Sequence, residues 1–183
     1  PVGADDSVRP IPAAADCLPL RGRCLRSRRM KVWEQFPDIP LVVMGGGPLE
    51  EEFKAWADGK DNIYILGYTQ HDKCLSIVKG GEFVVFPSIW YEGCSMVEIE
   101  TESLGKALVA TDLGFSVEAI ENGVNGYKVK LGDTDEFVQT IKSLWNNPEK
   151  CQVMGQNARA DYEAKYLPED NYKQLMAIYK RLI

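Results

Sequence analysis

The sequence predicts an α/β domain built on one parallel sheet with helices on both faces. Short apolar runs, each suited to one buried strand, alternate along the chain with segments of helical periodicity. The clearest unit spans residues 82–111, where the apolar run of residues 83–86 is closed by Pro87 and followed by a loop and a helical segment. Gly105 is placed to end that helix before a second apolar run, residues 107–111. This strand–loop–helix–strand order is typical of a parallel sheet.

Composition narrows the class of protein. A chain of 183 residues with a hydrophobic fraction of 45% forms one domain with a sizeable core. Its net charge of −6 argues against a nucleic-acid surface. We expect a cytoplasmic protein, because no secretory signal or membrane span is visible and the five cysteines are scattered without a Cys-x-x-Cys pair. A single histidine, His71, cannot form a metal cluster by itself.

The first 29 residues differ from the rest of the chain. They are rich in proline, alanine and arginine and show neither helical nor strand periodicity. We therefore predict an irregular or altered N-terminal segment over residues 1–29 and a folded domain over residues 30–183.

The elements of that domain follow from local pattern in chain order. Apolar runs predict strands at residues 41–44, 62–66, 82–86, 107–111 and 127–129. Helical periodicity predicts a helix that ends at residue 36 and others at 49–56, 70–79, 95–104, 117–120, 134–146, 148–166 and 169–183. Pro48 and Pro148 suit the first turns of their helices, and Asp133 or Thr134 is a suitable cap. The stripe of Tyr172, Leu175, Met176 and Tyr179 is expected to pack in the core.

Two glutamates mark the candidate site. A helix that starts near Ser95 offers free N–H groups and the positive end of its dipole to a phosphate. Glu100 lies about 7 Å from that end, which is near the reach from a diphosphate to the ribose diol of one nucleotide. Glu92, on the preceding loop, would face the group at the other end of the diphosphate. From spacing alone, both could equally be solvated charges, as Glu98 and Glu102 are expected to be.

Residues 86–114 resemble the signature of the retaining glycosyltransferases of family 4, which have the GT-B fold. The matching residues are Pro87, Ser88, Glu92, Gly93, Glu100, Gly105, Thr111, Asp112 and Gly114. The resemblance extends from about Pro40 to the C-terminus. It implies a single Rossmann-like domain, the C-terminal half of a GT-B fold, with the N-terminal acceptor-binding half absent from this chain. The chain departs from the family pattern at Cys94, Glu98 and Phe115, where an aromatic residue, an aliphatic residue and a glycine are usual.

The resemblance also implies roles for individual residues. Glu92 would be the catalytic residue that holds the donor sugar, and Glu100 would bind the ribose. The other implied donor-binding residues are Gly93, Cys94, Ser95, Met96, Val97, Gly45, Gly46, Gly47, Gly67 and Tyr68. Arg23 and Arg28 faintly match the family's basic phosphate ligands.

The implied reaction is transfer of a hexose, with retention, from a UDP- or GDP-sugar to an acceptor hydroxyl, in polysaccharide or glycoconjugate synthesis. We expect no metal and no cofactor, with the nucleotide sugar as substrate. A sugar, lipid or glycan acceptor would be bound by the missing N-terminal domain, which could also bring peripheral membrane association. This chain alone is expected to be inactive. Two alternatives stay open: a nucleotide-sugar-binding module without catalysis, and a nucleotide-sugar epimerase of the same fold.

Overall fold

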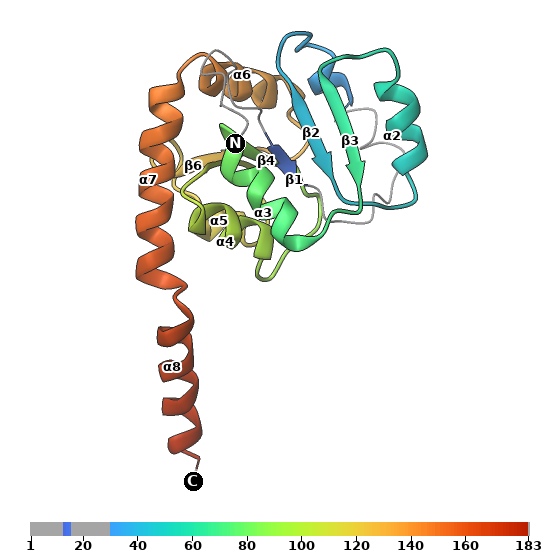
Figure 1. The fold of residues 1–183 in the computed structure, drawn as a ribbon. Helices are drawn as coiled ribbons and strands as arrows, with labels where there is room; N and C mark the ends of the chain where they lie inside the picture. Colours follow the sequence, from blue (N-terminus) through green and yellow to red (C-terminus); the bar gives the residue numbers. More distant parts are fainter. Residues whose placement is uncertain (1–12, 16–29, 183) are drawn as a thin grey trace, which may run out of the picture.

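The computed structural model describes residues 13–15 and 30–182. These residues form a six-stranded parallel sheet in the order β3-β2-β1-β4-β5-β6 (Figure 1). The strands are β1 (Ala13–Ala15), β2 (Leu41–Met44), β3 (Ile63–Gly67), β4 (Phe83–Phe86), β5 (Ala107–Thr111) and β6 (Gly126–Val129). The order reverses between β1 and β4, which is the Rossmann arrangement with its ligand-binding crevice at that switch point. The predicted α/β class and parallel sheet are confirmed.

Strand β1 differs from the prediction, because residues 1–29 were expected to be irregular throughout. Ala13–Ala15 instead lies in the middle of the sheet, with Ala14 opposite Val43 of β2 and Val85 of β4. Three alanines carry neither the β-branched residues nor the alternation that indicates a strand, so only pairing with two neighbours reveals it. Arg23 and Arg28 lie outside the described residues.

The helices agree with the predicted ranges to within a few residues. After a helical turn at residues 30–33 come α2 (Glu50–Ala57), α3 (His71–Gly80), α4 (Met96–Ser103), α5 (Ser116–Ala119), α6 (Thr134–Trp145), α7 (Pro148–Lys165) and α8 (Pro168–Lys180). Asp133 caps α6 by accepting a hydrogen bond from the Glu136 N–H (2.9 Å). Pro148 stands in the first turn of α7, as predicted.

The sheet is buried on both faces. In β4, Phe83 and Val85 join one hydrophobic cluster with residues of α6, whereas Val84 and Phe86 join a second with Val78 of α3. All four side chains of β4 are therefore buried. Burial on both sides explains why the strands are continuous apolar runs without polar alternation.

Helix α7 packs tightly against the turn between α4 and β5. Gly105 ends α4 with a left-handed φ of 66°, and its N–H donates to the Glu102 carbonyl (2.9 Å). This confirms the predicted helix-ending glycine. Gly155 of α7 lies so close to this turn that a Cβ built on it would collide with the Gly105 carbonyl oxygen.

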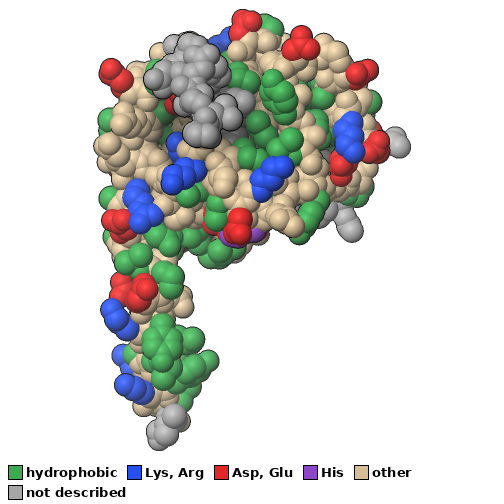
Figure 2. Space-filling view, viewed as in Figure 1, with side chains coloured by type: hydrophobic (Ala, Val, Ile, Leu, Met, Phe, Trp, Pro, Cys, Tyr) green, Lys and Arg blue, Asp and Glu red, His purple; other side chains and the backbone are tan. Residues whose placement is uncertain are grey.

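Helix α8 contradicts the core-packing prediction for its apolar stripe. It extends away from the sheet (Figure 1), and none of its residues 168–180, all within the described part of the chain, is buried. Tyr172 and Tyr179 are 63% and 50% exposed, and Figure 2 shows hydrophobic side chains gathered on this helix. Helical spacing reveals an apolar face but not what the face contacts, so the stripe alone was misleading.

We expect Gly155→Ala to destabilise the domain, because the added methyl meets backbone that has no room to move. Overpacking of this kind costs about 1–3 kcal/mol. Chemical denaturation of the purified chain measures the loss. Gly80→Ala is the matched control, since Gly80 is also helical but a Cβ there meets nothing within 4 Å. Equal stability of the two variants would contradict the tight α7 contact.

Candidate functional site

The backbone of Glu92 is held by the turn that follows β5. Glu92 stands on the loop after β4, and strands β4 and β5 pair up to Phe86 opposite Ala110, so their loops leave the sheet side by side. The Phe115 N–H donates a hydrogen bond to the Glu92 carbonyl (2.8 Å). A Cβ on Gly114 would lie 2.7 Å from both the nitrogen and the carbonyl oxygen of Glu92, and Gly114 has a φ of 60°. Only glycine fits this position, for both reasons.

The loop that carries Glu92 leads directly into the N-terminus of α4. Ser95 is buried and caps the helix, with its Oγ accepting a hydrogen bond from the Glu98 N–H (3.4 Å). Gly93, Cys94 and Met96 are exposed around this helix start. The first turn of a helix has N–H groups without intrahelical partners, so this exposed end can receive an anionic group.

Glu100 lies further along α4, where that helix meets the start of α3. Its side chain is 29% exposed, and its Oε1 lies 3.8 Å from Nδ1 of His71, the first residue of α3. Burial, and next the charge of Glu100, raise the pKa of the nearby Cys74 thiol. From the sequence, His71 was notable only as a single histidine that cannot form a metal cluster by itself. Its position beside Glu100 depends on how α3 packs against α4, which no local pattern indicates.

The two predicted glycine turns are joined to each other. The Gly45 N–H donates to the Gly67 carbonyl (2.8 Å), which connects the loop after β2 to the turn after β3. Glu50, in the first turn of α2, lies over both turns: its carboxylate oxygens would be 2.8 Å from a Cβ on Gly67 and 3.1 Å from one on Gly46. The sequence did not single out Glu50. Tyr68 follows this turn and is 87% exposed.

All these loops follow carboxyl ends of parallel strands, so they lie at one edge of the sheet. The prediction of a ligand site at this edge is consistent with the geometry. Among the described residues, no group of three or more histidine, cysteine, aspartate or glutamate side chains is arranged to hold a metal ion. The same residues include no helix that is long and apolar enough to cross a membrane.

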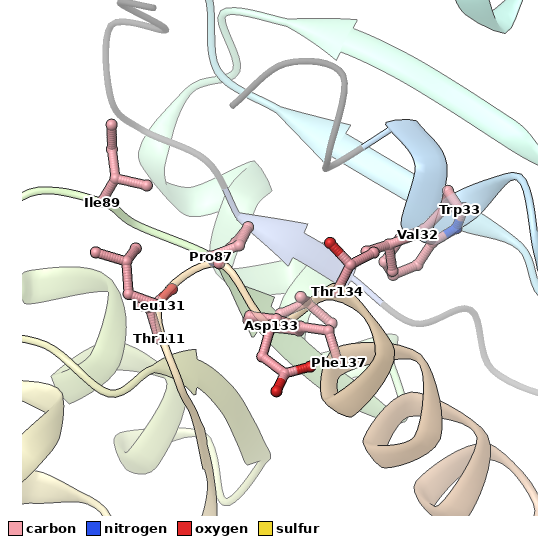
Figure 3. Close-up of a pocket in the computed structure, with 11 residues that line it drawn as sticks. Val32, Trp33, Pro87, Ile89, Thr111, Leu131, Asp133, Thr134 and Phe137 are labelled. Atoms are coloured by element: carbon pink, nitrogen blue, oxygen red, sulfur yellow. The ribbon is translucent and has the colours of Figure 1, made fainter. Parts of the chain in front are cut away.

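An apolar cavity of about 70 Å³ lies beside α6 at the same edge (Figure 3). Val32 and Trp33 lie on one side of it, and Ile89 and Leu131 on the other. None of the predicted site residues in the described part of the chain lines it. Its lining is mostly apolar and includes the acidic side chain of Asp133, so it would not suit a charged diphosphate.

Glu98 and Glu102 contradict the expectation that they are solvated charges on the helix surface. Their side chains are 0% and 2% exposed. Burial raises the pKa of each to about 7; Asp161 adds to the shift at Glu102, and Lys165 opposes it. The two residues stand one turn apart on one face of α4, and Glu100 stands between them in sequence on another face. The three glutamates look alike in sequence and differ only in what their faces of the helix contact.

Phe115, one of the departures noted from the sequence, packs against the end of α7. Its ring centroid lies 6.0 Å from that of Tyr166. The turn that holds Glu92 is thus supported from a second side.

Comparison with known proteins identifies a family for this arrangement. A family model described as "Glycosyl transferases group 1" matches residues 28–161. The D-rhamnosyltransferase WbpZ of Pseudomonas aeruginosa is 30% identical over 132 residues, which cover 70% of this chain and 35% of that protein. The alpha-D-kanosaminyltransferase of Streptomyces kanamyceticus is 30% identical over 148 residues, 79% of this chain and 38% of that protein. The chain thus spans little more than a third of the length of these relatives.

Solved structures share the fold at low identity. Anabaena Alr3699/HepE in complex with UDP-glucose aligns with a TM-score of 0.79 and 18% identity, over 93% of this chain and 49% of that one. Sucrose-phosphate synthase from Thermosynechococcus elongatus aligns with a TM-score of 0.80 and 20% identity, over 94% of this chain and 45% of that one. Both likenesses confirm the GT-B type of fold.

We expect Glu102→Gln to make the stability of the domain less dependent on pH. In the wild type the raised pKa means that folded Glu102 keeps its proton between about pH 4.5 and 7 while the unfolded chain loses it. That stabilisation is complete below pH 4.5 and is lost as pH rises through 7. The variant should therefore gain up to about 2 kcal/mol on the wild type between pH 5 and pH 8.

Urea denaturation at both pH values measures this difference. Glu149→Gln, at an exposed position in the first turn of α7, serves as the control and should follow the wild type. If Glu102→Gln and the wild type changed equally in stability between pH 5 and pH 8, Glu102 would be ionised in the folded state at both pH values.

Proposed function

The chain belongs to the group 1 glycosyl transferases, and we propose that it is the donor-binding part of a retaining, family 4 enzyme that transfers a hexose from a nucleotide sugar to an acceptor hydroxyl. One observation carries the proposal: Glu92 and Glu100 belong to one loop–helix unit at the switch edge of the sheet, with the exposed start of α4 between them in the chain. A diphosphate at that helix start would have the sugar on one side and the ribose on the other. The match to UDP-glucose-bound Alr3699/HepE supports this choice of ligand.

The diphosphate would be bound by the backbone around the start of α4. The proposed contacts come from Gly93, Cys94, Ser95, Met96 and Val97. Helix N-terminal amides carry about half a positive charge and need not rearrange as the diphosphate leaves. Arg23 and Arg28 remain proposed as further phosphate ligands. No cofactor or metal enters this proposal, because amides and basic side chains meet the charge of the leaving group.

The nucleoside would lie between α4 and the two glycine turns. Glu100 is a half-buried residue of α4 and lies beside His71, the first residue of α3. It would accept hydrogen bonds from both ribose hydroxyls. The base would rest at the Gly67–Tyr68 turn and be recognised mainly by backbone groups. The loop of Gly45, Gly46 and Gly47 lets the backbone approach the donor closely.

Glu92 would hold the hydroxyls of the donor sugar and place negative charge near the anomeric carbon. In the proposed reaction the bond from the anomeric carbon to the diphosphate breaks, and a bond to the acceptor oxygen forms on the same face of the sugar. The departing diphosphate oxygen takes the electron pair of the broken bond and accepts the proton of the acceptor hydroxyl. The close contact of Gly114 with the Glu92 backbone and the hydrogen bond from the Phe115 N–H form a clamp around Glu92. This clamp supports the proposed role, since it fixes Glu92 on the loop that leads into α4.

The acceptor would be a sugar, lipid or glycan held by a further domain, in a cytoplasmic enzyme that associates with a membrane through that domain. A second candidate is a nucleotide-sugar-binding module without catalysis. The two candidates differ in whether sugar transfer occurs.

We expect the purified 183-residue chain to bind a nucleotide sugar and not to transfer it, because transfer requires donor and acceptor to be held together by both walls of a cleft. Calorimetry with UDP, GDP and their sugars measures binding, and radiolabelled donor with sugar or lipid acceptors measures transfer. Robust acceptor-dependent transfer would show that these residues supply both walls. Conversion of a UDP-sugar to its epimer without acceptor would favour the epimerase.

Glu100→Gln should weaken nucleoside diphosphate binding about tenfold or more, because it removes the charge that strengthens two hydrogen bonds to the ribose. Hydrogen bonds to charged groups contribute about 1.5–3 kcal/mol each. Titration of UDP and GDP into the wild type and the variant measures the loss.

Glu92→Gln should leave nucleoside diphosphate affinity nearly unchanged and weaken the preference for the sugar-bearing donor. Glu149→Gln, at an exposed position in the first turn of α7, is the control and should change neither affinity. If Glu92→Gln and Glu100→Gln both left the affinities for the nucleotide and its sugar nearly unchanged, the two glutamates would be ordinary surface charges.

A further inference from the structure

We propose that Glu98 is a positioning residue that ties the start of α4 to the turn that holds Glu92. The tie itself does not depend on the proposed function, whereas its effect on donor binding does. Neither the group 1 family match nor the pattern of the two site glutamates assigns a role to Glu98, and the family signature has an aliphatic residue at its position.

The contacts of Glu98 join two segments at once. Its Oε1 accepts a hydrogen bond from the Ser116 hydroxyl (3.0 Å), and Ser116 is the first residue of α5. Its backbone N–H is bound by the Ser95 Oγ at the cap of α4 (3.4 Å). Ser116 is itself buried. Glu98 therefore connects the helix start beside Glu92 with the segment that follows Gly114 and Phe115.

The chain from Ser116 back to Glu92 is short and has little freedom. Phe115, the preceding residue, donates its N–H to the Glu92 carbonyl, and Gly114 is in close contact with the same peptide unit. Moving Ser116 away from α4 would pull on the hydrogen bond that holds Glu92. The Glu98–Ser116 hydrogen bond thus secures the clamp from the side of α4.

The surroundings of Glu98 favour its protonated form. The charged or titratable groups that face it are Glu92 on the loop, Glu102 on its own helix and Tyr166 at the end of α7. All three are acidic groups. Oε2 of Glu98 has no hydrogen-bond partner among the described residues. Burial raises its pKa to about 7, hydrogen bonds from Ser116 and Ser95 oppose the shift, and Glu92 adds to it.

Ionisation should loosen the tie, because a charged Glu98 gains hydration when α5 moves away from α4. A carboxyl with a pKa of about 7 when closed and 4.5 when open raises the opening equilibrium about tenfold between pH 6 and pH 8. A diphosphate at the start of α4 brings further negative charge, so donor binding should favour the protonated form. By linkage, donor affinity should fall as pH rises through 7.

Amide hydrogen exchange of Phe115, followed by NMR on the 183-residue chain, tests the tie without any ligand. In the wild type, the protection factor of this amide should fall about tenfold from pH 6 to pH 8. Glu98→Gln preserves an acceptor for Ser116 and cannot ionise, so its protection factor should not change with pH. Ser116→Ala should lower protection at both pH values, by about fivefold.

Glu149→Gln is the control, since it removes an exposed carboxyl in the first turn of α7. It should retain the pH dependence of the wild type at Phe115. The proposal is overturned if Glu98→Gln shows the same pH dependence as the wild type, or if Ser116→Ala leaves the protection of Phe115 unchanged.

Calorimetric titration with UDP tests the consequence for the donor. The affinity of the wild type should fall about fivefold more than that of Glu98→Gln between pH 6 and pH 8, and the variant accounts for the titration of UDP itself. Identical pH dependence would overturn the coupling to donor binding. If neither UDP nor GDP bound to either protein, the proposed function would be overturned, while the exchange of Phe115 would still decide the tie.

Discussion

The close approach of Gly114 to the peptide of Glu92 is the constraint on which the candidate site depends. Parallel pairing of β4 with β5 brings their loops out of the sheet side by side, and the backbones then meet without an intervening side chain. A hydrogen bond from Phe115 completes the contact. The catalytic role proposed for Glu92 requires a rigid backbone, and the glycine turn contributes to that rigidity.

The buried face of α4 shows that this rigidity has a cost. Glu98 and Glu102 each have one carboxylate oxygen without a partner among the described residues, and burying such groups lowers stability once they ionise. An aliphatic residue at position 98 would pack without this penalty. In return, Glu98 forms a directional bond to Ser116 that a methyl group cannot form. Glu98 thus lowers the stability of the domain near neutral pH, and its bond to Ser116 fixes the position of α5 relative to α4.

The solved structures of similar fold show how much change in sequence this fold tolerates. Solved structures at 18% and 20% identity keep the fold, so the sheet order and the two-sided core tolerate wide changes in sequence. The shape of the core requires only apolar residues of suitable size. Polar contacts such as Glu98–Ser116, and the packing of Phe115 on Tyr166, depend on individual side chains. Differences in the behaviour of members of this family are therefore to be sought at such positions.

Local pattern was sufficient for much of the structure. The strands from β2 to β6, the helix boundaries and the glycine that ends α4 follow from the apolar runs, proline and glycine around them, because these signals act over a few neighbouring residues. The spacing of Glu92 and Glu100 was likewise visible, since one helix sets the distance between them. The roles of these two glutamates remain predictions.

Tertiary contacts decided the rest. Strand β1 is recognised only by its two neighbours in the sheet, and the apolar stripe of α8 is exposed although its spacing suggested a core. Glu98 and Glu102 were expected to be solvated and are buried, whereas Glu100 meets His71. Except for β1, which no local pattern revealed, the sequence by itself determined the element and the face on which each of these residues stands. What covers that face depends on segments distant in the chain, and periodicity contains no information about them.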